Sequence, residues 1–541
     1  MYISFSELPG NHNLFLDYLY EFENVKNFYK MDFRNKEEYI KIFKKAADSH
    51  ADFRGQLSSI LIDQYKNFNP SDKTRENISS LKDKNTLAVV TGQQLGIIGG
   101  PLYTFYKIMT AIKLSSYLTE RYDDYKFVPV FWLEGDDHDF NEVRELNLVN
   151  DNNEVVKVAY GEEVLEDENK GSVGNLVFND MLNSFYEDLE KNIRTTEFTP
   201  ALLEKIKSFY ASGKTFMQSF KELIFWMFDE YGLVVFDPQD KRLKEHLKPV
   251  FKKEITDFRQ HTEKLVNISA QLEEVYHAQV KIRPVNLFYS NEEGRFLIEP
   301  VENEFRLRRK RKRFSYEELI DLIDKEPECF SPNVLLRPIC QDYILPTAFY
   351  VGGPSEISYF AQVTPLYDFY NIEAPILYPR SSATIIEKNI STIIEKYDID
   401  LAELFMDPEK LKQKVIDSIS KVSVEETFGN ASNEIEIIFD QLKEKLFEFD
   451  KTISDTSSKY KQKIFHHLNE LKDKASEAQK RKHEITLRQI DKISSSVFPN
   501  SNLQEREINF IYFANKYSVD IIKRIFEELT INKFEHQIIS L

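Results

Sequence analysis

Short apolar runs separated by longer amphipathic stretches mark the first part of this 541-residue chain. Residues 87–90 and 127–133 are continuous apolar runs, which are typical of strands buried on both faces of a sheet. Between them, apolar positions from Leu102 onward recur with helical spacing. A strand, a helix and a second strand form a βαβ unit, and such units pair their strands in parallel. The pattern therefore predicts an α/β fold with a parallel sheet.

The same alternation continues to residue 384 and is interrupted twice. Residues 145–200 are acidic, rich in Asn and weakly patterned, and residues 240–330 begin with a charged helical stretch at 241–275. We interpret both regions as insertions into one core domain, 1–384. Further apolar runs predict strands at 233–236, 334–339, 347–351 and 375–378. Parallel strands that end at one edge form the crevice in which such folds bind ligands.

The remaining residues, 385–541, contain almost no Gly or Pro before Pro499. Two series of mainly apolar residues recur every seven positions and are offset by four: Leu446, Ile453, Tyr460 and His467, and Ile464, Leu471, Ala478 and Ile485. Sustained seven-residue spacing with dense Lys and Glu predicts an extended helical coiled coil. The seam can pair as a hairpin within one chain or with a second subunit, and the spacing fits both.

Composition narrows the functional classes. The net charge of −18 argues against a general nucleic-acid binder, and we interpret the basic cluster at 306–313 as a solvated strand edge or hairpin. The start of the chain has no secretory signal, and no apolar run approaches the ~20 residues that span a bilayer, so we expect no membrane association. Cys329 and Cys340 fit no CxxC pattern, which indicates a reduced, cytoplasmic protein.

The Gly-rich turn between the first two predicted strands is the strongest candidate site. It contains Thr91-Gly92-Gln93-Gln94 and, at the helix entry, Gly99-Gly100-Pro101. A strand, a Gly-rich turn and a helix start together form an anion site, because backbone N–H groups and the helix dipole favour negative charge. Gln93 and Gln94 suit a polar ligand, and Lys107 can reach back toward an anion. The spacing matches neither common phosphate loop, and a tight structural turn is the alternative.

A second cluster, Asp136-Asp137-His138-Asp139, follows the next predicted strand. Carboxylates beside an imidazole can act as acid or base or hold a hard cation. Asp139, with Glu142 three residues later, also fits a helix N-cap. We predict no separate metal site, because the sequence has no H-x-x-H or H-E-x-x-H spacing.

A third cluster repeats the Gly-Gly-Pro helix entry in Gly352-Gly353-Pro354-Ser355-Glu356. Two such entries can place two helix N-termini at one site, although turn chemistry alone also explains the glycines. Arg337, at the predicted end of a strand, and Arg380, in Pro379-Arg380-Ser381-Ser382, are candidate clamps for a carboxylate or phosphate.

Together these pieces resemble one family, the cysteine ligases that catalyse the last step of bacillithiol biosynthesis. The resemblance rests on Val90-Thr91-Gly92-Gln93-Gln94, Gly99-Gly100-Pro101-Leu102-Tyr103-Thr104, Phe131-Trp132 with Asp137-His138-Asp139, residues 331–338, Tyr350-Val351-Gly352-Gly353-Pro354, Pro499-Asn500 and Leu503-Gln504-Glu505-Arg506. It extends over nearly the full chain. It implies a Rossmann-like core laid out like a class I aminoacyl-tRNA synthetase, and a C-terminal coiled coil, 385–541, that forms a homodimer.

The resemblance also implies the reaction, in which the cysteine carboxyl group is joined to the amine of glucosaminyl malate. A free carboxylate has no leaving group, so we predict activation by ATP with Mg²⁺. We predict Gln94, Asp136 and His138 as catalytic residues. Gly99, Gly100 and Lys107 are predicted to hold phosphate, and Arg337 or Arg380 the malate carboxylates. The other predicted binding residues are Thr91, Gly92, Gln93, Tyr103, Trp132, Asp137, Gly352, Gly353, Glu356 and Ser381.

Two alternatives come from other functional classes. A degenerate nucleotide fold can serve as a scaffold that assembles through its coiled coil, which predicts no stabilisation by small molecules. A metal-dependent hydrolase can be built on Asp136, Asp137 and His138, which predicts stoichiometric metal.

Overall fold

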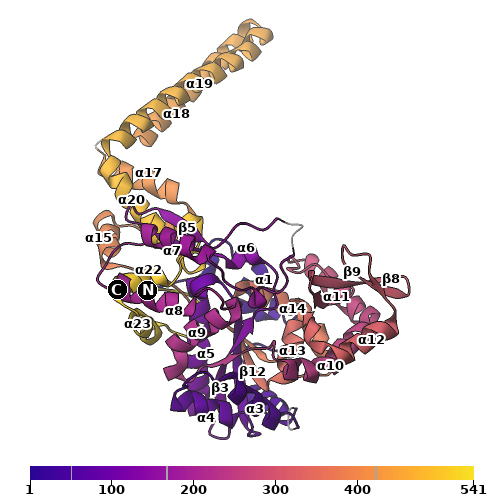
Figure 1. Cartoon of the computed structure of the whole chain (residues 1–541). Helices are drawn as coiled ribbons and strands as arrows, with labels where there is room; N and C mark the ends of the chain where they lie inside the picture. The colour runs from indigo at the N-terminus through magenta and orange to yellow at the C-terminus, as the bar shows by residue number, and fades with distance from the viewer. Residues whose placement is uncertain (50–51, 166–168, 421–422) are drawn as a thin grey trace. The chain divides into compact units, whose positions relative to one another are not determined.

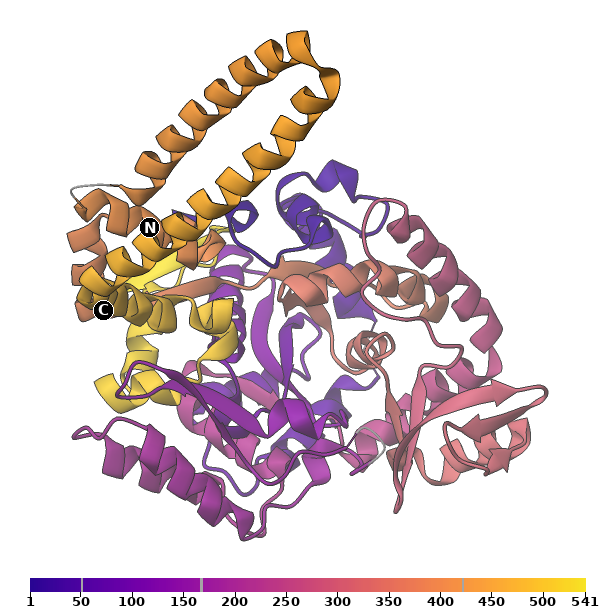
Figure 2. The ribbon, with the colours of Figure 1, turned by 90° about the horizontal axis from the view of Figure 1, so that it is seen from above.

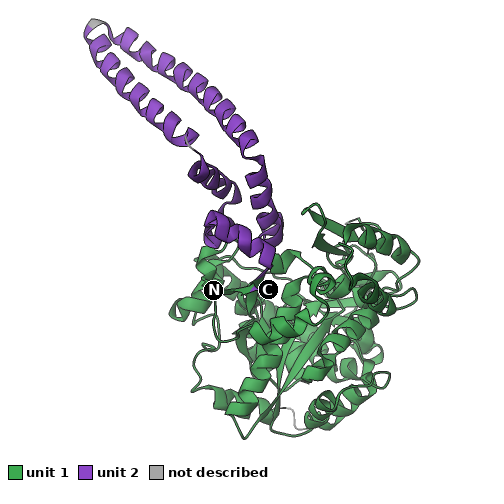
Figure 3. Ribbon diagram, turned by 90° about the vertical axis from the view of Figure 1, so that its left-hand side faces the viewer, with its two compact units in different colours: residues 1–384, 504–539 green, residues 385–503, 540–541 purple. Residues whose placement is uncertain are grey.

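The chain divides into two compact units (Figure 3). The computed structural model describes residues 1–49, 52–165, 169–420 and 423–541. The first unit comprises Met1–Thr384 and Gln504–Ile539, and the second comprises Ile385–Leu503 and Ser540–Leu541. The sequence-based division placed a helical coiled-coil domain and a closing segment in 385–541; in the structure, residues 504–539 belong to the first unit.

The core of the first unit is a five-stranded parallel sheet (Figure 1). Its strands are β2 (Thr86–Gln94), β3 (Lys126–Glu134), β6 (Val234–Phe236), β12 (Thr347–Gly352) and β13 (Ile376–Pro379), in the spatial order β13-β12-β2-β3-β6. Five of the six predicted strands are therefore confirmed. Numbered by chain order within this sheet, the strands run 5-4-1-2-3, which is the Rossmann order, and the direction of the order reverses between β2 and β12.

The first strand of the sheet, β2, is longer than the strand predicted at 87–90. β2 continues to Gln94, so the Thr91-Gly92-Gln93-Gln94 motif lies in the strand and not in the following turn. Its register places Gly92 beside Trp132 and Gln94 beside Glu134. A Cβ at Gly92 would lie 3.0 Å from the Trp132 carbonyl oxygen, which explains the need for glycine. β2 and β3 end together at Gln94 and Glu134.

Helices pack around this sheet (Figures 1 and 2). α5 (Leu102–Arg121) packs along β2 and β3, and α14 (Pro354–Tyr370) packs against β12. The other helices of this unit are α1 (Asn13–Tyr20), α2 (Tyr39–Asp48), α3 (Arg54–Gln64), α4 (Asp72–Ser80), α6 (Phe140–Val143), α7 (Met181–Asn192), α8 (Thr199–Phe209), α9 (Phe216–Phe228), α10 (Lys241–Thr256), α11 (Phe258–Glu273), α12 (Tyr316–Lys325), α13 (Arg337–Ile344), α21 (Gln504–Glu507), α22 (Ile511–Tyr517) and α23 (Ile521–Glu528).

Two predicted elements are wrong. The stretch 241–275 is two helices, because Asp257 has non-helical dihedral angles and separates α10 from α11. The stretch 334–339 is not a strand: β11 (Phe330–Pro332) ends before it, and α13 begins within it. Pro338 fits the first turn of α13, where its missing N–H costs nothing, and Asn333 Oδ1 accepts from the N–H groups of Leu335 and Leu336. The apolar composition of this segment therefore reflects a buried helix start.

The two inserted regions carry their own small sheets. In the first, β4 (Glu145–Val149) and β5 (Val155–Ala159) form an antiparallel hairpin. In the second, β7 (Leu287–Asn291), β8 (Gly294–Val301), β9 (Glu304–Leu307), β10 (Arg313–Phe314) and β11 form an antiparallel sheet in the order β10-β9-β8-β7-β11. The basic cluster lies on its β8–β9–β10 edge, where Arg306 pairs with Glu299 and Arg313 with Glu304. This confirms the interpretation of that cluster as a hairpin edge.

The closing segment, 504–539, packs onto the core of the first unit. β15 (His536–Ser540) lies between β1 (Tyr2–Ile3) and β14 (Ser382–Ile386) in a three-stranded sheet. The Leu102 N–H, at the start of α5, donates to the Ile508 carbonyl oxygen at 3.0 Å. Asn509 Nδ2 donates to the carbonyl oxygens of Ile98 and Gly100 at 2.9 and 2.7 Å. The closing segment therefore binds both the carbonyl groups of the Gly-rich turn and the first N–H of α5.

The second unit is helical. Its helices are α15 (Lys388–Tyr397), α16 (Leu401–Met406), α17 (Pro408–Ile419), α18 (Val424–Phe449), α19 (Lys451–Lys482) and α20 (Glu484–Val497). The long helices α18 and α19 lie side by side as an antiparallel hairpin (Figures 2 and 3), with Lys461 paired to Glu436 and Lys472 to Glu425. The coiled coil therefore pairs within one chain. In the described parts of the chain, no helix combines the length and apolar character needed to cross a bilayer.

The heptad residues face away from this hairpin seam. The buried positions of α19 are Ser454 and Ser457, whereas Ile453, Tyr460 and Leu471 are exposed. The sequence series thus marks an outward apolar face of the hairpin instead of the contact between its two helices.

Replacing Asn509 by Ala tests how the closing segment holds the Gly-rich turn. The variant leaves two buried carbonyl oxygens without a donor, and each unsatisfied group costs ~1–3 kcal/mol, so we expect a loss of about 2–4 kcal/mol in the free energy of unfolding. Denaturant unfolding followed by circular dichroism measures it. Asn152→Ala, at an exposed position, is the matched control. Equal unfolding midpoints for the two variants would contradict the expectation.

Candidate functional site

A cavity of about 580 Å³ opens in the first unit where β2, β3 and β12 end, at the reversal of strand order. This is the position at which parallel α/β sheets bind ligands. The predicted site residues that line it are Gly92, Gln93, Gln94, Tyr103, Lys107, Asp137, His138, Arg337, Gly353, Glu356 and Arg380. The cavity is also lined by residues that we did not predict: Glu134, Glu142, Phe288, Arg295, Pro332, Asn333, Val334, Tyr350, Pro354, Ser355, Tyr359 and Arg506.

Seven predicted residues lie outside the cavity lining: Thr91, Gly99, Gly100, Trp132, Asp136, Gly352 and Ser381. Most have structural contacts instead. Thr91 Oγ1 donates to the Val351 carbonyl oxygen, and Ser381 Oγ to that of Thr530. The Trp132 ring stacks on Phe236. Gly352 accepts a hydrogen bond from the Arg380 N–H at its carbonyl oxygen.

The Gly99–Gly100 turn does not form the predicted phosphate site. Both glycines are buried and have positive φ, 81° and 70°, which a residue with a side chain adopts at a cost. Asn509 occupies the carbonyl groups of the turn, and Ile508 takes the first N–H of α5. The anion-accepting groups of that helix start are therefore covered by the chain itself, and the structural-turn alternative describes these glycines.

Lys107 is held inside the cavity wall by three oxygen groups. Its Nζ donates to the Gly92 carbonyl oxygen at 2.8 Å and to Gln93 Oε1 at 2.9 Å, and it forms an ion pair with Glu356. Burial lowers the pKa of Lys107. Glu356 also accepts hydrogen bonds from the Gly353 N–H and the Tyr350 hydroxyl. Lys107 therefore joins the ends of β2 and α14 and is not a free phosphate ligand.

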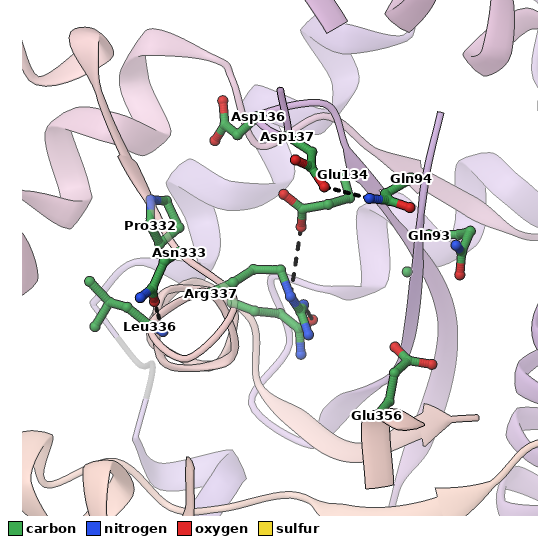
Figure 4. A network of polar contacts seen from close by, with 12 residues as sticks. Gln93, Gln94, Glu134, Asp136, Asp137, Pro332, Asn333, Leu336, Arg337 and Glu356 are labelled. Carbon is green, nitrogen blue, oxygen red and sulfur yellow. Dashed lines mark hydrogen bonds and ion pairs between the residues drawn. The ribbon is translucent and has the colours of Figure 1, made fainter. Parts of the chain in front are cut away.

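The two predicted arginine clamps are also engaged. Arg337 donates to Gln341, Tyr350 and Tyr359 at 3.0–3.2 Å, and its Nε lies 3.7 Å from Glu134 Oε2 (Figure 4). Arg380 donates to Glu505 Oε1 at 2.6 Å and to the Ser381 carbonyl oxygen at 3.0 Å. Both guanidinium groups are buried and have partners.

Arg506 is the cavity cation that sequence reasoning missed. It follows Glu505 in α21 and lines the cavity, and no described residue forms a hydrogen bond or ion pair with its side chain. Burial lowers its pKa, and neighbouring Arg380 adds to this. The signal was present in the Leu503–Arg506 motif, but no sequence pattern indicates that this segment lines the same cavity as the strand ends at Gln94 and Glu134.

Asp137, His138 and Gln94 form a polar group at the ends of β2 and β3. Gln94 Nε2 donates to Asp137 Oδ2 (Figure 4), and Asp137 Oδ1 accepts from the His138 N–H at 2.6 Å. The His138 ring is half exposed, and its Nδ1 lies 3.3 Å from Arg295 NH1. Burial, followed by the charge of Arg295, lowers the pKa of His138. Both effects favour the neutral imidazole.

Asp136 points into a different environment. Its carboxylate accepts from Lys244 Nζ and Gln239 Nε2, both at 2.9 Å. The structure thus separates Asp136 from His138 and does not support their shared catalytic role. The expected N-cap is confirmed, because Asp139 Oδ1 accepts from the Glu142 N–H at the start of α6. Among the described residues, no three His, Cys, Asp or Glu side chains are grouped to hold a metal ion. The geometry therefore gives the hydrolase alternative no support.

Glu134 is the second site residue that sequence reasoning missed. It ends β3, lines the cavity and has a buried Oε2 without a hydrogen-bond partner in the described chain. Burial raises the pKa of Glu134 to about 7, against the opposing charge of Arg337. Its position at the carboxyl end of a predicted parallel strand was the available signal. The sequence analysis instead placed the catalytic carboxylate in the Asp136–Asp139 cluster directly after it.

The fold and this cavity define a Rossmann-like α/β protein with a charged ligand cavity at its topological switch point and an appended helical hairpin. The chain belongs to the BshC family of bacillithiol biosynthesis. The family models "Bacillithiol biosynthesis BshC, N-terminal Rossmann-like domain" and "C-terminal coiled-coil domain" match residues 1–381 and 383–541. The predicted family and fold class are confirmed.

Curated relatives carry the name "Putative cysteine ligase BshC". The chain is 34% identical to that of Salinibacter ruber over 98% of its own length and 96% of the relative's. For Chloroherpeton thalassium the identity is 33%, over 97% and 96%. A solved chain from Campylobacter jejuni described as "putative arginyl t-RNA synthetase" aligns with 86% of this chain and 99% of its own at 10% identity and a TM-score of 0.22. A TM-score this low does not establish a shared fold, and the class I synthetase layout stays a prediction.

The raised pKa of Glu134 predicts a pH-dependent stability difference between the protein and its Glu134→Gln variant. The carboxyl group titrates near 4.5 when unfolded and near 7 when folded, so its ionisation destabilises the fold as pH rises through this window. The variant does not titrate there. We expect the variant to gain up to about 3 kcal/mol in free energy of unfolding, relative to the wild type, between pH 4 and pH 8.

Denaturant unfolding at several pH values measures this difference. Glu145→Gln, at a surface residue paired with Lys157, is the matched control for the chemistry of the substitution. A difference between wild type and Glu134→Gln that does not change with pH would contradict the raised pKa.

Proposed function

We propose that this protein joins the cysteine carboxyl group to the amine of glucosaminyl malate and so completes bacillithiol. Full-length similarity to relatives named cysteine ligases supports the chemistry. The structural observation that carries the proposal is a cavity at the switch point of a Rossmann-like sheet, lined by a guanidinium that has no partner among the described residues and by an incompletely paired carboxylate. Its volume of about 580 Å³ lies within the ~300–1,000 Å³ typical of small-molecule sites.

Arg506 is the group best suited to a malate carboxylate. A guanidinium binds a carboxylate through two parallel hydrogen bonds, and among the described residues Arg506 has no hydrogen-bond or ion-pair partner that would compete. Arg337 and Arg380, the candidates that the sequence offers for this role, use their donors within the protein. Gln93 and Gln94 remain candidates to orient the sugar or the cysteine, since both line the cavity.

Amide formation from a carboxylate also needs activation. A bound ATP with its Mg²⁺ supplies the leaving group that the cysteine carboxylate lacks. The first turn of α14 is the candidate for its phosphates, because Pro354 and Ser355 line the cavity and a helix N-terminus favours anions, although the N–H of Gly353 there already donates to Glu356. This assignment replaces the Gly99–Gly100 turn, whose polar groups are covered.

The ligase proposal is tested by incubating the protein with cysteine, glucosaminyl malate and ATP–Mg²⁺ and measuring the amide product by mass spectrometry. Replacing Arg506 by Gln removes one charge-assisted contact, worth ~1.5–3 kcal/mol, so we expect KM for glucosaminyl malate to rise about 10- to 100-fold. Arg75→Gln, a surface substitution on α4, should leave KM unchanged.

The outcomes separate the two claims. No product from the wild-type protein with ATP or another nucleoside triphosphate would contradict the ligase function. Product formation with an unchanged KM in Arg506→Gln would remove Arg506 from substrate binding and leave the ligase function standing.

We also propose that the protein is a homodimer in which a second copy covers the outer face of the α18–α19 hairpin. Ile453, Tyr460 and Leu471 are 52–59% exposed on α19, and Ile438 and Phe447 are about 60% exposed on α18. Apolar residues repeated every seven positions stabilise helix pairing only when a partner covers them. The antiparallel hairpin leaves these residues uncovered, which favours a second copy of the same surface.

Replacing both Ile464 and Leu471 by Glu places charges on this face. We expect the wild type to elute with twice the mass of one chain in light-scattering chromatography and the double variant with the mass of one chain, both with unchanged helical circular dichroism. Gln462→Glu, at an exposed polar position of the same helix, is the control and should remain dimeric. A wild type that is monomeric at micromolar concentration would contradict the proposal.

A further inference from the structure

Glu134 differs from the other carboxylates near the cavity in how few contacts it makes. Glu356 accepts from Gly353 and Tyr350 and pairs with Lys107. Asp137 accepts from Gln94 and from a backbone N–H. Glu134 accepts no hydrogen bond from any described residue, although its Oε2 is buried. A buried carboxylate in this state has the capacity to accept a proton from a bound molecule.

The nearest charged neighbour of Glu134 balances its charge without donating a hydrogen bond to it. Its nearest cation is Arg337, whose Nε lies 3.7 Å from Oε2, beyond hydrogen-bond distance (Figure 4). Tyr359 and Gln341 fix that guanidinium from the other side. Gln94, beside Glu134 in the sheet register, is turned to Asp137. Glu134 therefore faces the cavity with its charge balanced by a cation that does not occupy its oxygens.

We propose that Glu134 is the general base that takes the proton from the substrate amine. This inference rests on the proposed ligase function. The amine nitrogen attacks the activated carbonyl carbon of cysteine and forms the C–N bond. The C–O bond to the leaving group breaks, and its electron pair departs with that group. The proton released from nitrogen passes to a carboxylate oxygen of Glu134, so charge and atoms balance.

The two bases expected from the sequence suit this step less well. The Asp136 oxygens accept from Lys244 and Gln239 and lie outside the cavity lining. His138 Nδ1 lies 3.3 Å from Arg295 NH1, which can only donate. The same Nδ1 lies 3.4 Å from Asp137 Oδ1, so protein groups already surround this nitrogen, and burial together with the charge of Arg295 opposes protonation of the ring by lowering the pKa of His138. Glu134, with a pKa raised to about 7 by burial, is also poised for transfer near neutral pH.

The test is the pH dependence of kcat for amide formation by the full-length protein and its Glu134→Gln variant. We expect the wild-type kcat to fall as pH drops through about 7, where Glu134 takes up its proton. The variant should lose about 10²- to 10⁴-fold in kcat and lose this inflection. KM for glucosaminyl malate should change little. Glu134→Asp, which keeps a carboxyl group, should regain part of kcat together with the inflection, and Glu145→Gln should match the wild type.

The possible results are distinct. An active wild type with an undiminished kcat in Glu134→Gln, or with the same inflection in that variant, would overturn the role of Glu134 alone. A wild type that forms no product would overturn the ligase proposal and this inference with it. Thermal unfolding of each variant, with and without glucosaminyl malate, shows whether a loss of kcat occurs in a folded protein that still binds substrate.

Discussion

The buried ion pair between Arg380 and Glu505 holds the site together. Its side chains are 4% and 1% exposed, and Glu505 also accepts from Ser382 and the Ala383 N–H. Breaking a buried pair by removing one partner is costly, because the other charge stays uncompensated. Through this contact the closing segment is fixed to the chain directly after β13. Its next residue, Arg506, is thereby directed into the cavity.

The same closing segment decides which polar groups remain available to a ligand. Ile508 and Asn509 cover the helix start that would otherwise attract an anion. Lys107, Arg337 and Arg380 are hydrogen-bonded within the protein, so their charges shape the cavity without being free ligands. Preorganised charges of this kind need no rearrangement when substrate arrives. In the part of the chain that the structure describes, Arg506 then lines the cavity without a hydrogen-bond or ion-pair partner, and the nearest cation to Glu134 is Arg337 at 3.7 Å.

Sequence reasoning recovered the parts of the fold that local pattern determines. The apolar runs of β2, β3, β6, β12 and β13 are buried on both faces, and so their composition alone marked them as strands. It failed at 334–339, where a buried helix start has the same apolar composition, and Pro338 and the Asn333 cap were the overlooked signals. Of the site, it found motif residues adjacent to strand ends, including Gln94 and His138.

The parts of the site that were missed depend on contacts between distant segments. Nothing near Arg506 indicates that it lines the same cavity as the end of β2, and nothing near Gly99 indicates that Asn509 binds the carbonyl groups of its turn. Heptad spacing has a related limit. It located an apolar face on α19, but spacing cannot distinguish the face that meets α18 from an exposed outer face. Small polar residues such as Ser454 and Ser457 are buried in the contact between the two helices. The larger apolar residues lie on the exposed side of the hairpin. The heptad series of this chain therefore marks the exposed side of the hairpin and not the contact between its two helices.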